Sequence, residues 1–240
     1  MESATRKIST AGMTQPGTPG AITPWCASKH KRLFDIVASC LLLVLTSPVM
    51  VVIGIVVRVS SRGPILFRQL RVGRDGKYFS LLKFRSMTHG RQELGPALTH
   101  RTDPRVTTVG RFLRRFKLDE LPQFFNVVRG DMSLVGPRPD VPEYYRSLNH
   151  AQQRVLFLRP GVTGAATVHF RDEEALLSRV PQLELLSFYT GILLPKKISI
   201  DLAYARHATF WTDLNLLFRT MTSILMPHTA LMADTAGEQH

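Results

Sequence analysis

The longest hydrophobic pattern in the chain is the run from Ile36 to Val57, which contains no charged residue. About 22 apolar residues in a helix are enough to cross the roughly 30 Å hydrocarbon core of a bilayer. Basic residues flank the run on both sides: Lys29, Lys31 and Arg32 before it, and Arg58, Arg62, Arg68, Arg71 and Arg74 after it. Because positive charge stays on the cytoplasmic side of a membrane, a simple span would have to carry one of these clusters across.

The middle of this run contains Ser47-Pro48. Proline lacks an amide donor and clashes with the carbonyl four residues back, that of Val44, so the helix should kink. The hydroxyls of Thr46 and Ser47 can satisfy local carbonyls, as apolar surroundings require. The half before the proline covers only about 18 Å at about 1.5 Å per residue. We therefore predict a re-entrant helix over 29–62 that turns at Ser47-Pro48, in preference to a span or to a buried helix of a soluble protein.

The rest of the chain alternates short apolar segments with polar ones. Ile65–Arg71 and Tyr78–Met87 predict two strands around a Gly73–Gly76 turn, and 88–104 predicts a loop. Apolar residues at helical spacing predict helices over Thr108–Phe116, from Asp119 to about Arg129, over 142–158, over 172–190 and over 196–226. The last of these would carry one apolar stripe, made of Leu202, Phe210, Trp211, Leu214, Leu217, Phe218 and Met221.

These patterns predict a mostly α fold with a small β component (α+β), in a monotopic membrane protein with a Pro-broken re-entrant helix and interfacial amphipathic helices. We expect four parts. A flexible tail over 1–28 is rich in Ser, Thr, Gly and Pro. The membrane helix over 29–62 follows, then the main domain over 63–226, and a second flexible tail over 227–240.

Charge is concentrated in the first half of the chain. The 240 residues include 31 Lys+Arg and 18 Asp+Glu, a net charge of +13, and residues 29–129 alone hold 19 basic and 6 acidic side chains. We therefore expect an anionic partner for this window. Two cysteines, Cys26 and Cys40, form neither a disulfide framework nor a CxxC metal site. The motifs GxGxxG, GxxxxGK[ST], HExxH and GxSxG are absent from the sequence.

The segment Lys117–Gln123 places two carboxylates at the start of a predicted helix. Pro122 is tolerated only in a first helical turn, so we expect Asp119 to be the N-cap and Glu120 the first helical residue. Arg114 and two further cations precede them, and nearby cations lower a carboxylate pKa. We therefore expect Asp119 to be ionised, as a nucleophile or metal ligand. A capping aspartate beside a solvated glutamate is the simpler alternative.

Several cations are candidates for phosphate binding. In Gly136-Pro137-Arg138-Pro139 the two prolines restrict the backbone around Arg138. A guanidinium aimed in this way can hold a diphosphate in bidentate fashion. A plain surface turn is the alternative. Lys83 and Arg85 lie on a predicted strand, and each is either a phosphate ligand or an ordinary residue of an amphipathic strand. Arg159–Gly164 is a second stiff loop, equally ambiguous taken by itself.

Taken together, the chain from about Lys31 to Thr222 resembles the bacterial sugar transferases, the small monotopic phosphoglycosyl transferases. The motifs that carry the resemblance occur in the family's order. They are Lys31–Asp35, Ser47-Pro48, Lys83–Met87, Asp103–Arg105, Val109–Arg114, Asp119–Gln123, Gly130–Pro139, Arg159–Gly164 and Phe210–Leu214. An ordered series of this kind is far more specific than any one motif.

The resemblance implies an enzyme of the bacterial inner (cytoplasmic) membrane, with its catalytic domain on the cytoplasmic face. It would move a sugar-1-phosphate from a UDP-sugar to a polyprenyl (undecaprenyl) phosphate, and so start the assembly of an exopolysaccharide, capsule, O-antigen or glycoprotein glycan. The resemblance covers the catalytic core only, without the extra four-helix membrane domain of larger relatives. Inner-membrane lipid would be a further partner, and the oligomeric state stays open.

In family terms, Asp119 would attack the phosphorus next to the sugar, expel UMP and carry a covalent phospho-sugar. The polyprenyl phosphate would then attack this intermediate. Glu120, together with Asp119, would help to hold Mg²⁺. The cations implied in substrate binding are Arg111, Arg114 and Arg138, and, as weaker matches, Lys83 and Arg85.

One segment departs from the family pattern. Ala165–Glu174 stands where many relatives carry a Trp-Ala-Gln version with an Asn-Gly-Arg ending, and the change could bear on the choice of sugar. Two other functions remain as alternatives. A membrane-anchored nucleic-acid binder would also explain the positive charge, although no nucleic-acid module is recognised. A catalytically inactive scaffold is the other, and the intact Asp119-Glu120 pair speaks against it.

Overall fold

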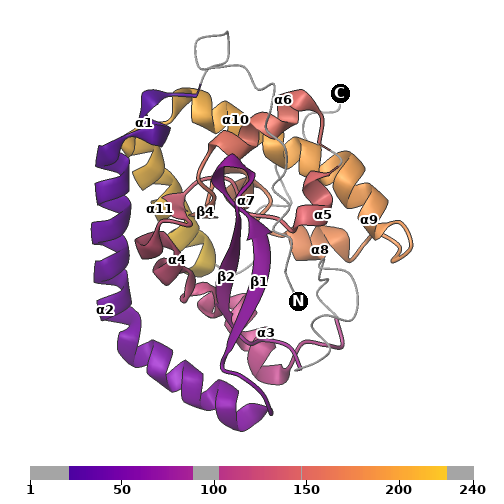
Figure 1. Cartoon of the computed structure of the whole chain (residues 1–240). Helices are drawn as coiled ribbons and strands as arrows, with labels where there is room; N and C mark the ends of the chain where they lie inside the picture. Colours follow the sequence, from indigo (N-terminus) through magenta and orange to yellow (C-terminus); the bar gives the residue numbers. More distant parts are fainter. Residues whose placement is uncertain (1–21, 89–102, 147, 226–240) are drawn as a thin grey trace, which may run out of the picture.

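The computed structural model describes residues 22–88, 103–146 and 148–225. Within these ranges the chain is mostly helical, with two small two-stranded sheets (Figure 1), which confirms the predicted balance of helix and sheet. The predicted tail over 227–240 lies outside the described residues. So do most of the tail predicted over 1–28 and most of the loop predicted over 88–104.

The long helix α2 (Lys29–Ser60) contains Pro48 and runs in two parts that meet at a bend (Figure 1). Thr46 Oγ1 donates to the carbonyl of Leu42 at 2.7 Å, and Ser47 Oγ donates to the carbonyl of Val44 at 2.8 Å. Val44 is the residue whose carbonyl has no amide partner at position 48. The prediction that hydroxyl groups satisfy the carbonyls at the break is therefore confirmed.

Most apolar side chains of α2 are exposed. Val44, Leu45 and Val59 have 71%, 64% and 81% of their surface accessible. Among the described residues, α2 is the one helix that is long and apolar enough to cross a membrane. The core helix of a soluble protein would instead be mostly buried. That alternative does not fit this helix.

The start of α2 is fixed by a buried carboxylate. Asp213 accepts hydrogen bonds from Lys31 Nζ at 2.5 Å, from Trp25 Nε1 at 3.0 Å and from the hydroxyl of Tyr204. Trp25 lies in a short helix, α1 (Pro24–Ala27). Residues 22–28, which the sequence assigned to a flexible tail, therefore pack against the C-terminal helices. The segment rich in Ser, Thr, Gly and Pro ends just before residue 22, so composition alone does not mark where the packed structure begins.

The first sheet is the predicted hairpin. Strands β1 (Leu66–Val72) and β2 (Tyr78–Phe84) pair antiparallel, with Leu66 opposite Phe84 and Val72 opposite Tyr78. The turn between them holds Asp75 and Gly76 at positive φ. In Figure 1 the hairpin lies in the middle of the molecule, with α2 to its left and α5, α8 and α9 to its right.

The second sheet was not predicted. Strand β3 (Ser133–Val135) pairs in parallel with β4 (Gly161–Thr163). Three residues are too few to show the alternation that identifies a strand. The two loops that carry these strands meet closely at Gly136, where an added Cβ would lie 2.4 Å from the carbonyl oxygen of Arg159.

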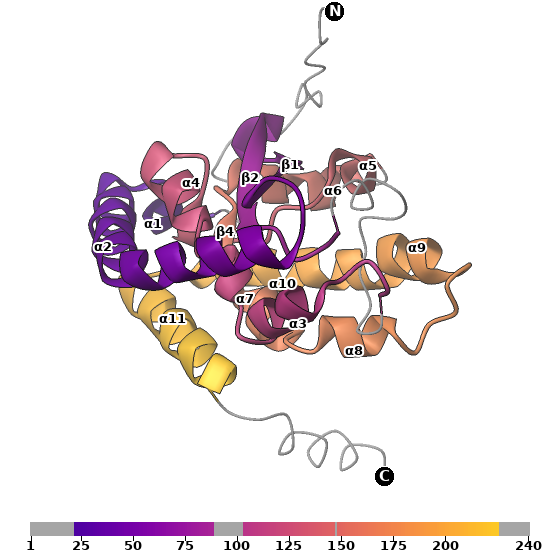
Figure 2. The same ribbon diagram turned by 90° about the horizontal axis from the view of Figure 1, so that it is seen from below.

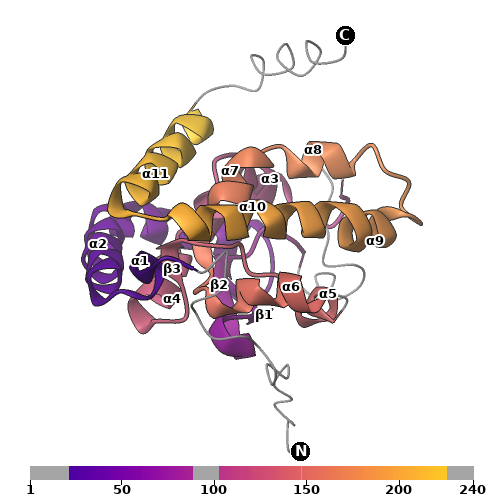
Figure 3. The same cartoon turned by 90° about the horizontal axis from the view of Figure 1, so that it is seen from above.

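Most of the remaining helices are short. They are α3 (Thr108–Arg115), η2 (Leu118–Glu120), α4 (Gln123–Arg129), α5 (Pro142–Tyr145), α6 (His150–Gln153), η3 (Arg154–Phe157), α7 (Ala165–His169), α8 (Glu173–Leu177), α9 (Leu185–Phe188), η4 (Tyr189–Leu193), α10 (Leu194–His207) and α11 (Phe210–Leu225). Figure 2 shows α3 beside the second part of α2, and Figure 3 shows α11 leaving the end of α10 at an angle.

The three long helices predicted after position 140 are wrong in extent, because each is interrupted. Helices α5, α6 and η3 fall within 142–158, and α8 and α9 within 172–190. The helix predicted over 196–226 breaks at Ala208, whose backbone is extended. There, Thr209 and Thr212 exchange side-chain to backbone bonds of 2.7 and 3.2 Å, which start a new helix.

The apolar stripe predicted for this last segment is divided by the same break. On α11, Trp211, Phe218 and Met221 are 73%, 67% and 59% exposed, so they do not belong to the core. Leu216, on another side of α11, is buried and packs against Val127 and Leu134. Helix α11 therefore has one buried side and one exposed apolar side.

Candidate active site

The predicted helix start at Asp119 is wrong. Asp119 and Glu120 lie in the 3₁₀ turn η2 (Leu118–Glu120), and α4 begins only after Pro122. Lys117, just before the turn, has a left-handed backbone with φ of 55° that ends the preceding helical segment. Both carboxylates consequently point inward, with 4% and 9% of their residue surfaces exposed, and Asp119 caps nothing.

Glu120 is held by two cations from distant parts of the chain. Lys83 Nζ, on β2, lies 3.0 Å from Glu120 Oε1. Arg138 donates to both carboxylate oxygens, with Nη2 2.5 Å from Oε1 and Nη1 3.2 Å from Oε2. Burial alone would raise the pKa of Glu120, but the charges of Arg138 and Lys83 outweigh it and hold that pKa well below its usual value. Glu120 is therefore ionised.

Asp119 is in the opposite situation. Its Oδ1 is buried and has no hydrogen-bond partner among the described residues. Burial raises the pKa of Asp119, the positive charge of Lys83 opposes this, and the negative charge of Glu120 raises the pKa further. The nearby cations do lower the pKa of Asp119, but the loss of solvent is the larger effect, so the expectation of a net lowering is wrong. A poorly solvated carboxylate beside a cation cluster is suited to nucleophilic attack.

The structure brings together only some of the predicted cations. Lys83 and Arg138 contact Glu120 directly. The charge of Arg114, on α3, acts on Asp119 and lowers its pKa, and its Nη1 lies 3.8 Å from Glu174 Oε1. These three cations surround the carboxylate pair from a strand, a loop and a helix.

Arg85 and Arg111 lie elsewhere. The guanidinium of Arg85 donates to the carbonyls of Val57, Ser61 and Pro64 at 3.0, 2.6 and 2.5 Å, so it closes the C-terminal end of α2. Strand β2 ends at Phe84, so Arg85 lies just beyond it, where its amide donates to the carbonyl of Ile65 at 2.9 Å. Arg111 bonds the hydroxyl of Thr108, on the exposed side of α3. Neither side chain contacts the carboxylate pair.

Sequence reasoning missed Arg71 and Asp140. Arg71, on β1, donates to the carbonyl of Pro139 at 3.1 Å and lies 3.5 Å from Asp140 Oδ1. Its charge acts on both Arg138 and Lys83. The only signal was the position of Arg71 in the basic window, on a strand paired with the strand of Lys83. The sequence predicts this pairing, but it gives no sign that Arg71 reaches Pro139 and Asp140.

Mg²⁺ fits these residues only with the help of a substrate. Within the described ranges no group of three or more His, Cys, Asp or Glu side chains could hold a metal ion. Asp119 Oδ1 is a free buried oxygen ligand, and Glu120 adds a second carboxylate. Mg²⁺ is commonly held by one or two carboxylates plus phosphate oxygens. The pair therefore fits a Mg²⁺ ion that also contacts a diphosphate.

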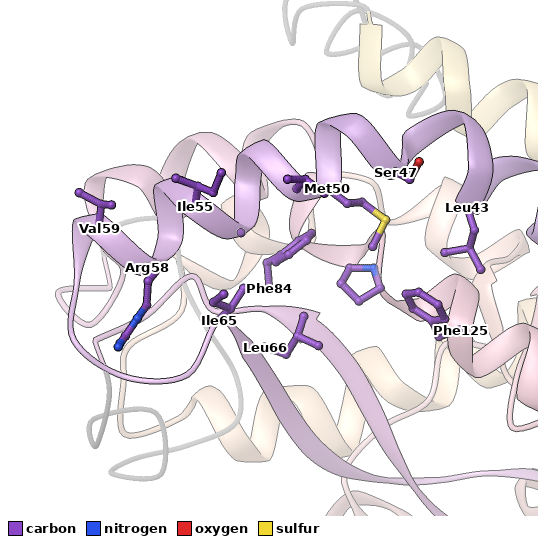
Figure 4. Close-up of a pocket in the computed structure, with 13 residues that line it drawn as sticks. Leu43, Ser47, Met50, Ile55, Arg58, Val59, Ile65, Leu66, Phe84 and Phe125 are labelled. Carbon is purple, nitrogen blue, oxygen red and sulfur yellow. The ribbon is translucent and has the colours of Figure 1, made fainter.

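An apolar groove runs along α2 (Figure 4). Its volume is about 690 Å³, and its lining is almost entirely carbon, with Ser47 and Arg58 as the polar residues. Met50 and other residues of α2 form one side, while Phe84 and Pro122 contribute the other. Pro122 is three residues from Asp119, and Phe84 follows Lys83 on the same strand. The groove is therefore lined by residues adjacent in sequence to Lys83 and close in sequence to Asp119.

The chain is similar to known proteins of one family. The family model for bacterial sugar transferases matches residues 26–227. A UDP-glucose:undecaprenyl-phosphate glucose-1-phosphate transferase of Klebsiella pneumoniae is 42% identical over 195 residues, 80% of this chain and 39% of that protein. One of the same description from Caulobacter vibrioides is 39% identical, over 86% of this chain and 74% of that protein.

A third relative transfers a different sugar by its description. It is a UDP-N-acetylgalactosamine-undecaprenyl-phosphate N-acetylgalactosaminephosphotransferase of Aeromonas hydrophila, 36% identical over 81% of this chain and 43% of that protein. The chain thus spans about two fifths of the length of two of these three relatives. The shared segment includes the carboxylate pair and the cations around it.

Proposed function

Because the chain belongs to the bacterial sugar transferase family, we propose that it is a phosphoglycosyl transferase, which moves a sugar-1-phosphate from a UDP-sugar to undecaprenyl phosphate and so initiates a surface polysaccharide or glycan. The observation that carries this proposal is the buried Asp119, with its unpartnered Oδ1, beside a Glu120 clamped by Lys83 and Arg138. Relatives described as transferases of this kind support the substrate class.

In the proposed first step, an oxygen of Asp119 forms a bond to the phosphorus that carries the sugar. The bond from this phosphorus to the bridging oxygen breaks, and UMP leaves with the electron pair. A phospho-sugar then remains esterified to Asp119. In the second step a phosphate oxygen of the acceptor attacks the same phosphorus, and Asp119 leaves as a carboxylate. Dividing the transfer in this way replaces one difficult step by two easier ones.

The surrounding cations would stabilise the transition state of both steps. Phosphoryl transfer depends chiefly on positioning and on neutralising charge at the phosphate oxygens. Arg138 contacts Glu120 and the charge of Arg114 acts on Asp119, so both guanidinium groups can bind the diphosphate. Asp119 and Glu120 would hold Mg²⁺, which would supply further neutralisation of negative charge. Glu120 keeps Lys83 and Arg138 in place before the donor arrives.

The membrane arrangement follows from α2 and the groove. We propose that α2 enters the cytoplasmic face of the inner membrane, turns at Ser47-Pro48 and leaves by the same face. The exposed apolar side of α11 would then rest at the membrane surface. The acceptor's polyprenyl chain would occupy the apolar groove beneath α2, whose carbon lining suits it. Its phosphate would reach the end of the groove at Pro122, close in sequence to Asp119.

Trapping the covalent intermediate tests this function. Purified full-length protein in lipid nanodiscs should release UMP from a UDP-sugar and, without acceptor, should gain the mass of one sugar phosphate on Asp119. Asp119→Asn should abolish both the adduct and the transfer. The matched control is Asp131→Asn, because Asp131 lies outside the site and accepts a hydrogen bond from Asn126 at 3.1 Å.

Two results would contradict the proposal. Full transfer by Asp119→Asn would exclude Asp119 as the nucleophile. Product that accumulates while the wild-type protein never carries the adduct would exclude a covalent route. A panel of UDP-sugars, scored by UMP release with undecaprenyl phosphate, would identify the donor, and EDTA would test the proposed need for Mg²⁺.

A further inference from the structure

A buried polar network lies behind the turn that carries Arg138. Asp140, 7% exposed, accepts a hydrogen bond at Oδ2 from the hydroxyl of Tyr189 at 2.8 Å. Lys197 Nζ in turn donates to that hydroxyl at 3.1 Å. Tyr189 and Lys197 are 1% and 4% exposed. These groups are 49 and 57 positions away from Asp140 in the sequence, so the fold alone brings them together.

The network holds the backbone on the C-terminal side of Arg138. Arg71 donates to the carbonyl of Pro139 and also faces Asp140 Oδ1. The amide of Val72 donates to the carbonyl of Asp140 at 3.1 Å. Asp140 is thus tied to the hairpin through its backbone and through Arg71, and to η4 through Tyr189. Arg138, whose guanidinium binds Glu120, lies two residues before Asp140 in the sequence.

The same network reaches the site from a second direction. Lys197 Nζ lies 3.0 and 3.2 Å from the two carboxylate oxygens of Glu173, at the start of α8. The negative charge of Glu173 acts on Arg138 and raises its pKa. The next residue, Glu174, faces Arg114. A buried lysine therefore fixes the helix start that lies beside both arginines of the site.

An irregular helix positions the Tyr189 hydroxyl to bond Asp140. It begins η4, a π-helical segment that continues into α10. Such segments are rare and are frequent at functional sites. Here the wider turn leaves the Tyr189 ring packed against Tyr144, with centroids 5.0 Å apart, and its hydroxyl between Asp140 and Lys197.

We propose that Tyr189 and Lys197 are positioning residues for Arg138. By holding Asp140, they fix the Gly136–Pro139 turn and aim the Arg138 guanidinium at the diphosphate of the donor. This inference rests on the proposed function, since it assigns the two residues to the same donor site. Neither would touch the substrate itself.

The test measures UDP affinity without turnover, on the full-length protein in nanodiscs with Mg²⁺. Tyr189→Phe removes one hydroxyl, keeps the ring and leaves a buried carboxylate oxygen without its donor. Losing a hydrogen bond to a charged group should weaken UDP binding by about tenfold. The matched control is Tyr204→Phe, which removes a half-buried hydroxyl that donates to Asp213 on α11, away from the carboxylate site. It should lower the melting temperature without changing UDP affinity.

A double-mutant cycle with Arg138→Lys separates positioning from general destabilisation. If Tyr189 acts through Arg138, Tyr189→Phe should weaken UDP binding less than about twofold in the Arg138→Lys background. Equal effects in both backgrounds, or an equal effect of Tyr204→Phe, would overturn the proposal. Should Tyr189→Phe fail to fold, Lys197→Met is measured in the same cycle. A wild-type protein that binds UDP but forms no adduct would contradict the proposed function, not this inference.

Discussion

Arg138 and Glu120 form a two-pronged ion pair in which each carboxylate oxygen accepts from a different guanidinium nitrogen, at 2.5 and 3.2 Å. The neighbouring Asp119 has no such contact, although it is just as deeply buried. The environment therefore drives the pKa values of two adjacent carboxyl groups apart, downward for Glu120 and upward for Asp119. Such a separation assigns different roles to the two groups.

This separation predicts opposite pH shifts in two variants. Adduct formation needs ionised Asp119, so its rate should fall as the pH drops through the pKa of Asp119. Lys83→Met removes a charge that lowers this pKa, so the acid limb should move to higher pH. Glu120→Gln removes a charge that raises it, so the limb of the residual activity should move to lower pH. The measurement is the rate of adduct formation against pH.

The control for this pair is Lys77→Met, which removes an exposed lysine from the hairpin turn. Its acid limb should coincide with that of the wild-type protein. If Lys83→Met and Glu120→Gln moved the limb in the same direction, the pH dependence would not come from Asp119.

Gly110 predicts a steric effect at the base of α3. A Cβ there would lie 1.9 Å from the carbonyl oxygen of Ser86, a backbone atom that cannot move aside freely. Gly110→Ala should therefore push α3 away from the end of β2, at a cost of about 1–3 kcal/mol. Since α3 also carries Arg114, the rate of transfer should fall as well. Thermal unfolding and UMP release measure the two effects.

Gly191→Ala is the matched control for this substitution. Nothing lies within 4 Å of a Cβ added at Gly191, and its φ is not in the left-handed region. The melting temperature and activity of this variant should stay close to those of the wild-type protein. A Gly110→Ala protein with unchanged stability would show that α3 is not packed on Ser86 as described.

Elements whose apolar residues follow a clear period were predicted correctly from the sequence. The prediction was wrong where the backbone angle of a single residue determines where a helix begins. The hairpin and α3 follow from alternation and helical spacing. The helix start near Asp119 was misplaced because Lys117 adopts positive φ, and a lysine gives no sign of this. Lys83 and Arg85 were grouped because both lie within the predicted strand Tyr78–Met87, but the observed strand β2 ends at Phe84, between them.

Electrostatics was the least predictable part of the site. The cations around Asp119 are visible in the sequence, and they argue for a lowered pKa. Burial reverses the direction, and burial depends on side chains that only the tertiary fold brings near. The Tyr189–Asp140 bond shows the same limit, since neither residue belongs to a motif. A local pattern can list charges, but their solvent exposure is a property of the fold.

Asp201 predicts a pH-dependent stability. This buried carboxylate on α10 accepts a hydrogen bond from the amide of Ala166 at 3.0 Å, and burial raises its pKa to about 7. The folded protein therefore binds this proton more tightly than the unfolded chain does. Its contribution favours folding at low pH and is lost as the pH rises from about 4 to about 7. Asp201→Asn keeps the acceptor and removes the titration.

The melting temperature at pH 8 should therefore be higher for Asp201→Asn than for the wild-type protein, by a few degrees, and the two should approach each other near pH 5. Glu184→Gln, at the exposed start of α9, is the control and should leave the pH profile unchanged. A lower melting temperature of Asp201→Asn at pH 8 would show that the ionised carboxylate stabilises the fold.

Pro48 predicts the topology of α2. With proline at the bend, a tag at residue 1 should be labelled only from the cytoplasm. Pro48→Ala restores an amide that can donate to Val44, so α2 can straighten into a helix of about 48 Å at about 1.5 Å per residue, long enough to span. Part of the population should then expose the tag to the periplasm and lose transferase activity. The basic flanks resist translocation, so the change should be incomplete.

Pro142→Ala, at the first position of α5, is the control, because no helical amide is missing there. A wild-type tag labelled from the periplasm would show that α2 spans the membrane and that the site does not approach it from a single face.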